Sequence, residues 1–262
     1  MSVVAITGAS GLLGRALLGS VPAGVHSIRA FSRRAAAGRS RVEWTQVDLA
    51  TGAGLDTALD GIDTIVHAAS SPRRDTYRTD VEGTRRLLEA ARAAGVRHVV
   101  YVSIVGVDRV PVSYYARKYE AERLVEQGAV PWSIVRATQF HDFAASLLDR
   151  MARLPVAIAP RGWRCQPVHV DEFADELWRR VADGPSGRTP DFAGPDVLTY
   201  EAMLRSWIAA RGITRRVAAL PIPGALSRAM RRGDATAPDR AVGALSWEAW
   251  LHARGARPRA AA

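Results

Sequence analysis

The sequence predicts an α/β protein with a doubly wound parallel sheet followed by a smaller C-terminal lobe. In the first two-thirds of the chain, short β-branched runs alternate with amphipathic stretches of helical length, which is typical of parallel strands joined by helices. A glycine-rich segment directly follows the first run. After about Phe140 the alternation ends, and prolines separate shorter elements. We therefore expect a sheet domain over 1–140 and a smaller lobe over 141–262, with some elements of the lobe returning to the sheet.

Six apolar runs have the length and composition of buried strands. They are Val3–Ile6, His26–Phe31, Val42–Val47, Thr64–His67, His98–Val102 and Trp132–Arg136. The amphipathic segments predict helices over Leu12–Ser20, Arg74–Ala94 and Ser113–Gln127, and, in the C-terminal lobe, over Asp171–Ala182, Tyr200–Ala210 and Trp247–Ala253. In such a sheet, ligands bind outside the carboxyl ends of the strands, where the direction of winding reverses.

The composition is that of a globular chain with a large excess of arginine. The 262 residues include 36 basic and 26 acidic side chains, for a formal net charge of +10, and 48% of the residues are apolar. Lys118 is the only lysine. Because arginine serves wherever only a positive charge is needed, this lysine is a candidate for a site that needs a compact ammonium group.

These features argue against several classes of protein. No apolar stretch reaches the ~18–20 residues of a membrane span, and the first residues run straight into a strand pattern, so a cytoplasmic protein is expected. The single cysteine, Cys165, cannot form an internal disulfide, and no spacing of histidine and cysteine indicates a metal site. The arginines after Arg205 are scattered among proline, glycine and alanine. We therefore expect a small-molecule substrate, and neither nucleic acid nor a membrane as a partner.

The strongest local pattern is three glycines, Gly8, Gly11 and Gly14, between the first strand and the first helix. The first glycine would turn the chain, the second would let a pyrophosphate approach the backbone, and the third would let the helix pack closely on the strand. The diphosphate would then lie at the helix N-terminus, where unpaired N–H groups favour an anion. The predicted dinucleotide contacts in this loop are Gly8, Ser10, Gly11, Leu12, Leu13 and Gly14.

The residues after the next strands indicate which dinucleotide is bound. The second strand runs into Ser32, Arg33 and Arg34 with no acidic residue nearby, and two arginines favour the 2′-phosphate of NADP(H) over NAD(H), which remains the alternative. Asp48, after the third strand, is suited to hydrogen bonding the adenine edge. The small residues after the fourth strand would let it lie against the dinucleotide, in the segment His67, Ala68 and Ala69.

A tyrosine and the lysine are spaced for acid–base chemistry. Lys118 follows Tyr114 by four residues on a predicted helix, so both side chains project from one face. An ammonium beside the phenol would lower the pKa of Tyr114 toward the neutral range. Tyr114 would then donate a proton to the carbonyl oxygen of a substrate, and Ser103, at the end of the fifth strand, would place a hydroxyl on the same oxygen. The predicted catalytic residues are therefore Ser103, Tyr114 and Lys118, with Lys118 also holding the nicotinamide ribose.

Alternatives remain open for several of these roles. Tyr115 is three residues before the lysine and competes with Tyr114, and Ser70 or Ser71 could replace Ser103 as the hydroxyl donor. The segment after the sixth strand should face the nicotinamide, which makes Gln139, Phe140 and His141 candidate substrate contacts. Glu120 and Glu122 flank the lysine and are expected at the surface.

Five motifs together resemble a known family. They are Thr7–Gly14, Asp80–Leu88, Ser103–Val107, Tyr114–Lys118 with Glu122, and Val168–Glu172, in the order found in the atypical and extended short-chain dehydrogenases/reductases. The chain is most similar to the NmrA-like NAD(P)H-binding proteins that are often labelled nucleoside-diphosphate-sugar epimerases. The resemblance covers nearly the whole chain. It implies a Rossmann domain, a small C-terminal substrate-binding lobe that closes over the nicotinamide, and chemistry carried by the serine, the tyrosine and the lysine.

Three functions follow as hypotheses. The first is an NADP(H)-dependent oxidoreductase that transfers a hydride between nicotinamide and a small carbonyl or quinone-like substrate. The second is a regulatory protein that senses NADP(H) without consuming it, because NmrA-like proteins include members that only bind the dinucleotide. The third, a nucleotide-sugar epimerase or dehydratase, would prefer NAD, which the two arginines disfavour.

Overall fold

A computed structural model of the chain describes residues 2–34, 41–72, 75–153 and 155–255. The chain divides into two compact units. Unit 1 consists of Met1–Ser103, Ser113–Arg136 and Phe173–Pro190, and unit 2 of Ile104–Val112, Ala137–Glu172 and Asp191–Ala262. Each unit therefore contains segments from both sides of the 140/141 boundary that the sequence suggests.

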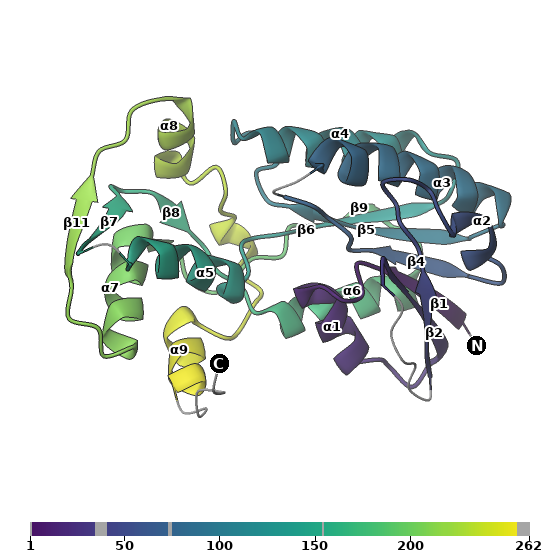
Figure 1. Ribbon diagram of the computed structural model, residues 1–262, viewed down its shortest axis with the longest axis horizontal. Helices are drawn as coiled ribbons and strands as arrows, with labels where there is room; N and C mark the ends of the chain where they lie inside the picture. The colour runs from purple at the N-terminus through teal and green to yellow at the C-terminus, as the bar shows by residue number, and fades with distance from the viewer. Residues whose placement is uncertain (1, 35–40, 73–74, 154, 256–262) are drawn as a thin grey trace. The chain divides into compact units, whose positions relative to one another are not determined.

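Unit 1 is built on a seven-stranded parallel sheet, which confirms the predicted fold class (Figure 1). The strands are β1 (Ser2–Thr7), β2 (Val25–Ser32), β3 (Val42–Gln46), β4 (Thr64–His67), β5 (His98–Ile104), β6 (Trp132–Ala137) and β9 (Gly187–Arg188). Their order in the sheet is β3-β2-β1-β4-β5-β6-β9. The winding therefore reverses between β1 and β4, where Ile6 is paired with Val66 on one side and with Ala30 on the other.

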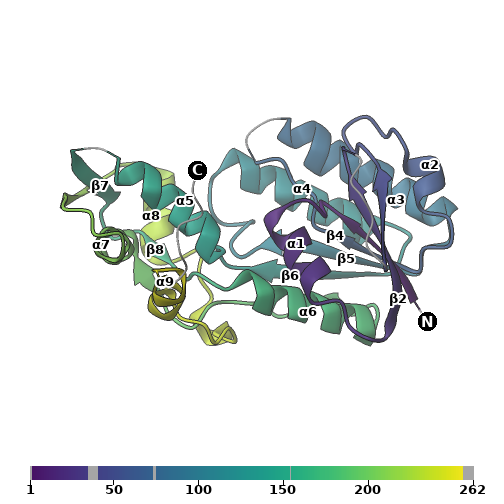
Figure 2. The same ribbon diagram turned by 60° about the horizontal axis from the view of Figure 1, so that its bottom comes forward.

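Helices cover both faces of this sheet. Figures 1 and 2 show α1 (Leu12–Gly19) and α6 (Val170–Asp183) on one face, and α2 (Leu55–Ala58), α3 (Gly83–Ala93) and α4 (Ser113–Gln127) on the other. The indole of Trp178 on α6 donates to the carbonyl of Leu17 on α1, at 3.2 Å. On the opposite face, buried side chains of α2, α3 and α4 form one apolar core with the sheet.

The helix predicted over Arg74–Ala94 differs from the observed one. Its first part is a π-helical turn, Tyr77–Glu82, which continues into α3. Segments of π-helix are rare, appear mostly as single turns within α-helices and are frequent at functional sites. Helical periodicity cannot separate the two forms, because both place apolar residues on one face of a continuous coil. By contrast, α4 begins and ends at the predicted residues, Ser113 and Gln127.

Unit 2 consists of short elements around an aromatic core. Its elements are α5 (His141–Met151), β7 (Val156–Pro160), β8 (Arg164–Cys165), β10 (Leu198–Thr199), α7 (Tyr200–Ala210), β11 (Arg216–Leu220), α8 (Ala225–Arg232), the 3₁₀ turn Pro238–Arg240 and α9 (Trp247–Gly255). Strands β7 and β11 pair in parallel, and β8 pairs with β10 in antiparallel fashion. Trp247 stacks on Trp250 with ring centroids 5.2 Å apart. The prediction missed α5 because its first residues were assigned to a ligand-contacting loop.

Among the described residues, no helix combines the length and the apolar character needed to cross a membrane.

Candidate functional site

The candidate site lies in unit 1 where the winding of the sheet reverses. The glycine-rich loop follows β1, and the segment after β4 follows the neighbouring strand on the other side of the reversal. Parallel strands direct their carboxyl ends to the same edge, so both segments meet there (Figure 1). This is the position at which an open α/β sheet binds its ligand.

The glycine loop is shaped as a cradle. Gly8 has a positive φ of 69°, and a Cβ at this position would come within 2.8 Å of the Ala69 backbone. A Cβ at Gly14 would lie 2.3 Å from the carbonyl oxygen of Gly8, so the helix can approach the loop only because Gly14 has no side chain. At Gly11 the nearest atom to an added Cβ is the oxygen of Gly8, at 3.1 Å. Gly8 and Gly14 are therefore required by packing, whereas Gly11 leaves room for a ligand.

The N-terminus of α1 is suited to an anion. Gly11 is its N-cap, and no side chain caps the helix. The first turn contains no acidic residue. The first N–H groups of a helix have no partner within it, and together with the helix dipole they favour a negatively charged group. The loop therefore fits the pyrophosphate of a dinucleotide, held by the backbone around Ser10, Leu12 and Leu13.

A cavity of about 260 Å³ adjoins this loop, and all its lining residues belong to unit 1. Most of the predicted dinucleotide contacts line it, as do Ser70 and Ser71. The predicted contacts in its wall are Gly8, Ser10, Gly11, Ser32, Arg33, Asp48, Ala68 and Ala69. The structure thus brings together residues that are up to 61 positions apart in the sequence.

The side chains at the adenosine end of this cavity differ in how they are held. Asp48 Oδ1 accepts a hydrogen bond from the N–H of Ala50 at 2.9 Å, and Asp48 itself is half-buried in the wall. Arg33 and Arg34 are exposed, and within the described part of the chain neither guanidinium is paired with a carboxylate. The two charges are therefore available to an anionic group.

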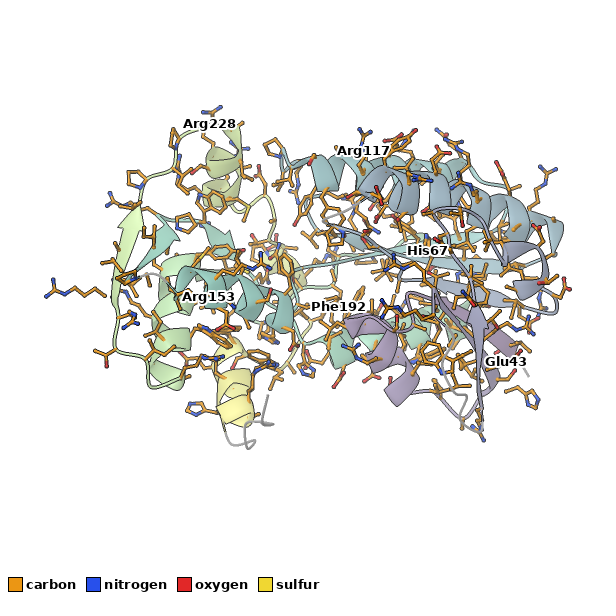
Figure 3. The ribbon with its side chains drawn as sticks, viewed as in Figure 1. Glu43, His67, Arg117, Arg153, Phe192 and Arg228 are labelled. Atoms are coloured by element: carbon orange, nitrogen blue, oxygen red, sulfur yellow. The ribbon has the colours of Figure 1, made fainter. Side chains whose placement is uncertain are left out.

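His67 does not line the cavity but contacts Thr7, which does. It lies inside unit 1 (Figure 3), its Nδ1 is 2.7 Å from Thr7 Oγ1, and its Nε2 is 2.9 Å from Thr84 Oγ1. Thr84 donates its one proton to the carbonyl of Asp80, so we assign the histidine proton to Nε2. Thr7 then donates to Nδ1 and accepts from the N–H of Ala69. This network links β1, the segment after β4 and the π-helical turn.

Buried neutral histidines should make the protein acid-labile. Burial lowers the pKa of His67 to about 3, and the pKa values of His98 and His141 to about 4, from 6.5. Between pH 6.5 and 4 the unfolded chain binds protons that the folded chain excludes, so stability falls as the pH falls, by about 1.4 kcal/mol per pH unit for each histidine. Urea unfolding at pH 7, 6 and 5 measures this slope. His67→Asn should reduce the slope of stability against pH by the contribution of one histidine. An unchanged slope would contradict the lowered pKa of His67.

The hydroxyl that contacts Tyr114 belongs to Ser70. The two oxygens are 2.8 Å apart, and Tyr114 is partly buried on the first turn of α4. Since Ser70 also lines the cavity, the phenol lies one hydrogen bond from the dinucleotide pocket. Of the alternatives left open by the sequence, the structure therefore favours Ser70 over Ser71 as the neighbour of the tyrosine.

The predicted effect of Lys118 on Tyr114 is wrong in the structure. Burial raises the pKa of Tyr114 well above 10, the hydrogen bond with Ser70 opposes this, and the charges of Asp80 and Tyr115 add to the increase. Lys118 is buried, donates to the carbonyl of Val102 at 2.8 Å and lies 4.2 Å from the centre of the Tyr101 ring. The ammonium is thus engaged elsewhere, and the phenol remains protonated.

The catalytic role of the Ser103 hydroxyl stays a prediction. Its hydroxyl is buried and makes no hydrogen bond to any residue that the structure describes. Tyr115 packs edge-on against Tyr114 with ring centroids 6.1 Å apart. Burial lowers the pKa of Lys118, whereas the charges of Asp80 and Glu122 raise it. Both side chains are buried in the structure, so the contacts predicted for Ser103 with the substrate and for Lys118 with the nicotinamide ribose stay predictions.

The candidate substrate contacts all belong to unit 2. Gln139 accepts from the Cys165 thiol at 3.4 Å, and Phe140 is the N-cap of α5. His141 is fully buried and stacks on Trp250 with ring centroids 5.3 Å apart. Its ring is therefore part of the aromatic core in this structure, and it offers no surface to a ligand. That Gln139 and Phe140 contact the substrate remains a prediction.

The order of the strands, the glycine cradle and the uncapped helix N-terminus define a dinucleotide-binding protein. The chain belongs to the NAD(P)H-binding family, which matches residues 8–153. This confirms the predicted resemblance to NmrA-like, atypical short-chain dehydrogenases/reductases. The fold and the loop thus agree with the family on binding NAD(P)H.

Individual relatives are distant. The (4-alkanoyl-5-oxo-2,5-dihydrofuran-3-yl)methyl phosphate reductase of Streptomyces griseus subsp. griseus is 32% identical over 208 residues, which cover 75% of this chain and 70% of the reductase. Several other curated relatives are matched over less than half of their own length. A nucleoside-diphosphate-sugar epimerase from Staphylococcus aureus has a similar structure, with a TM-score of 0.78 at 18% identity over 96% of this chain and 99% of the epimerase. The NADPH-dependent quinone oxidoreductase of Escherichia coli, complexed with NADPH, has a TM-score of 0.69 at 21% identity over 96% and 93%.

Proposed function

We propose that the protein is an NADP(H)-dependent reductase of a small carbonyl or quinone-like substrate. The observation that carries this proposal is the contact between the Tyr114 phenol and Ser70, a residue in the wall of the dinucleotide cavity. A bound reduced nicotinamide would supply the hydride. Tyr114 would supply the proton to the carbonyl oxygen.

The environment of Tyr114 suits a proton donor. Because burial and the charge of Asp80 raise its pKa, the phenol holds its proton through the neutral range and can release it only to an oxygen that becomes strongly basic. A carbonyl oxygen gains negative charge as a hydride reaches its carbon. The proposed roles of the other residues follow: Lys118 and Ser103 meet the nicotinamide ribose and the substrate, and Arg33 and Arg34 meet the 2′-phosphate.

The preference for NADP(H) can be tested with one arginine. Arg33→Ala should weaken NADPH binding about 10- to 150-fold, the loss expected for a charge-assisted contact of about 1.5–3 kcal/mol, and leave NADH binding nearly unchanged. Fluorescence titration with both cofactors measures the two affinities. Arg92→Ala, an exposed arginine on α3, is the matched control and should change neither. An equal loss for NADH and NADPH would refute the assignment.

The activity is tested by NADPH consumption. Purified protein is titrated with NADPH and NADH, and NADPH oxidation is then followed with aldehydes, ketones, quinones and the (4-alkanoyl-5-oxo-2,5-dihydrofuran-3-yl)methyl phosphate named in the S. griseus relative. Turnover with at least one substrate, and tighter binding of NADPH than of NADH, are the expected results.

Two other outcomes correspond to the remaining hypotheses. Tight NADPH binding without consumption across the panel would identify a redox sensor. Tighter binding of NAD⁺, with the cofactor retained through the reaction cycle, would favour the epimerase or dehydratase. The proposal as a reductase fails in either case.

A further inference from the structure

A buried carboxylate lies two hydrogen bonds away from the Tyr114 phenol. Asp80 is 1% exposed, and its two oxygens accept separate hydrogen bonds, one from Ser70 Oγ at 2.6 Å and one from the Ser71 N–H at 2.9 Å. Ser70 Oγ is in turn 2.8 Å from Tyr114 Oη. The three side chains form the chain Tyr114–Ser70–Asp80.

The direction of these hydrogen bonds follows from proton counting. A serine hydroxyl has one proton, and the 2.6 Å contact with a carboxylate is a charge-assisted bond that holds it. Ser70 can therefore meet Tyr114 only with a lone pair, so the phenol must donate to it. Without the carboxylate, the Ser70 hydroxyl could rotate and donate to Tyr114 instead.

The fold holds the carboxylate firmly in place. Asp80 lies in the π-helical turn, and its carbonyl accepts from Thr84 in the network that His67 links to β1. On the outer side, the guanidinium of Arg117 on α4 lies 5.0 Å from the centre of the Tyr77 ring in the same turn. The turn is therefore fixed to the sheet on one side and to the helix of Tyr114 on the other.

We propose that Asp80 is a positioning residue for Tyr114, which acts through Ser70 to orient the phenol hydroxyl until a substrate oxygen replaces Ser70 as its acceptor. The inference rests on the proposed function, in which Tyr114 is the acid. Neither Asp80 nor Ser70 exchanges a proton with the substrate. Their effect is to keep the hydroxyl in one orientation at the edge of the dinucleotide cavity.

The charge of Asp80 gives a readout that does not depend on turnover. The charge of Asp80 acts on Tyr114 and Lys118 on α4 and on Tyr101 on β5. Tyr115 also acts on Tyr114, and Glu122 acts on both Lys118 and Tyr101. The charge of Asp80 raises the pKa of Tyr114, so Asp80→Asn should lower the pKa of Tyr114. Phenolate absorbance during an alkaline titration, with Tyr114→Phe subtracted, measures this pKa.

Turnover separates a positioning role from a purely structural one. Asp80→Asn and Ser70→Ala should each lower kcat about tenfold, with KM and NADPH affinity within about twofold. Because Asp80 acts through Ser70, the double variant should be no slower than the slower single variant. Ser70→Thr retains the hydroxyl and should restore kcat.

Asp63→Asn is the matched control, since that carboxylate also accepts a backbone N–H, from Val3 at the other end of the sheet. It should leave kcat and the tyrosine titration unchanged.

Two results would overturn the proposal: additive losses in the double variant, or an unchanged tyrosine titration in Asp80→Asn. If Asp80→Asn does not fold, the comparison of Ser70→Ala with Ser70→Thr decides, because Ser70 is exposed and both substitutions should be tolerated. If the wild-type protein oxidises no NADPH, the reductase function fails, whereas the tyrosine titration still tests the effect of Asp80 on Tyr114.

Discussion

Tyr114→Phe should lower turnover by about 10²–10⁴, the usual contribution of a positioned general acid, while NADPH affinity stays within about twofold. The substitution removes one oxygen from a partly buried ring that contacts Ser70 and Tyr115, so the surrounding packing is preserved. Stopped-flow single turnover with saturating NADPH separates the chemical step from product release. A separate fluorescence titration with NADPH gives the affinity for the cofactor.

Tyr115→Phe is the matched control, because it removes the same atom from the adjacent ring. It should retain turnover within a few-fold. If Tyr115→Phe shows the large loss and Tyr114→Phe does not, the acid is Tyr115 and the contact with Ser70 has another purpose. If neither variant loses activity, tyrosine is not the proton donor.

The pH dependence of the wild-type rate tests the same assignment. A group with a raised pKa is protonated, and therefore competent as an acid, at every pH below that pKa. Since the pKa of Tyr114 is well above 10, the rate of reduction should not decline between pH 7 and pH 9. A rate that falls through this range would indicate that the phenol ionises there, as the spacing of Tyr114 and Lys118 alone predicts.

The contrast between the tyrosine and the lysine shows what spacing can predict. A separation of four residues correctly places both on one helix, and α4 has the predicted bounds. The partners of each side chain come from other elements: Ser70 lies after β4, and the Val102 carbonyl lies in β5. No local pattern encodes which of these comes within 3 Å, so the direction of the pKa shift could not be predicted from the sequence.

The glycine loop was more predictable because its determinants are local. Gly8 and Gly14 are required by backbone contacts within the loop and with the segment after β4, so their spacing alone indicates the turn. Asp80 begins one of the family motifs, but that motif gave no indication of its link to Tyr114 through Ser70. The sequence motif suggested an ordinary helix, and the π-helical turn that presents its carboxylate depends on packing against the sheet and α4.

In unit 2, by contrast, little could be predicted from local patterns. Strands β8 and β10 have two residues each, too few for an alternating pattern to be recognised. His141 was interpreted as a ligand contact because it follows a strand, but it begins a helix and stacks in an aromatic core. A polar residue type near a sheet edge does not specify whether it faces solvent or a cluster of tryptophans.

Glu122→Ala should destabilise the protein by about 3–5 kcal/mol, the cost of leaving a buried charge without its partner. Glu122 was expected at the surface of α4, yet it is fully buried and accepts two hydrogen bonds from Arg136 on β6, at 2.8 and 2.6 Å, and one from Arg188 on β9, at 3.1 Å. Glu126→Ala is the matched control on the same helix. Glu126 also accepts from Arg188, at 2.8 Å, but that pair is partly open to solvent and should contribute about 0–1 kcal/mol. Urea unfolding at pH 7 measures both losses. Equal losses would show that Arg136 finds another partner or water when Glu122 is removed, and that burial of the ion pair does not determine its contribution to stability.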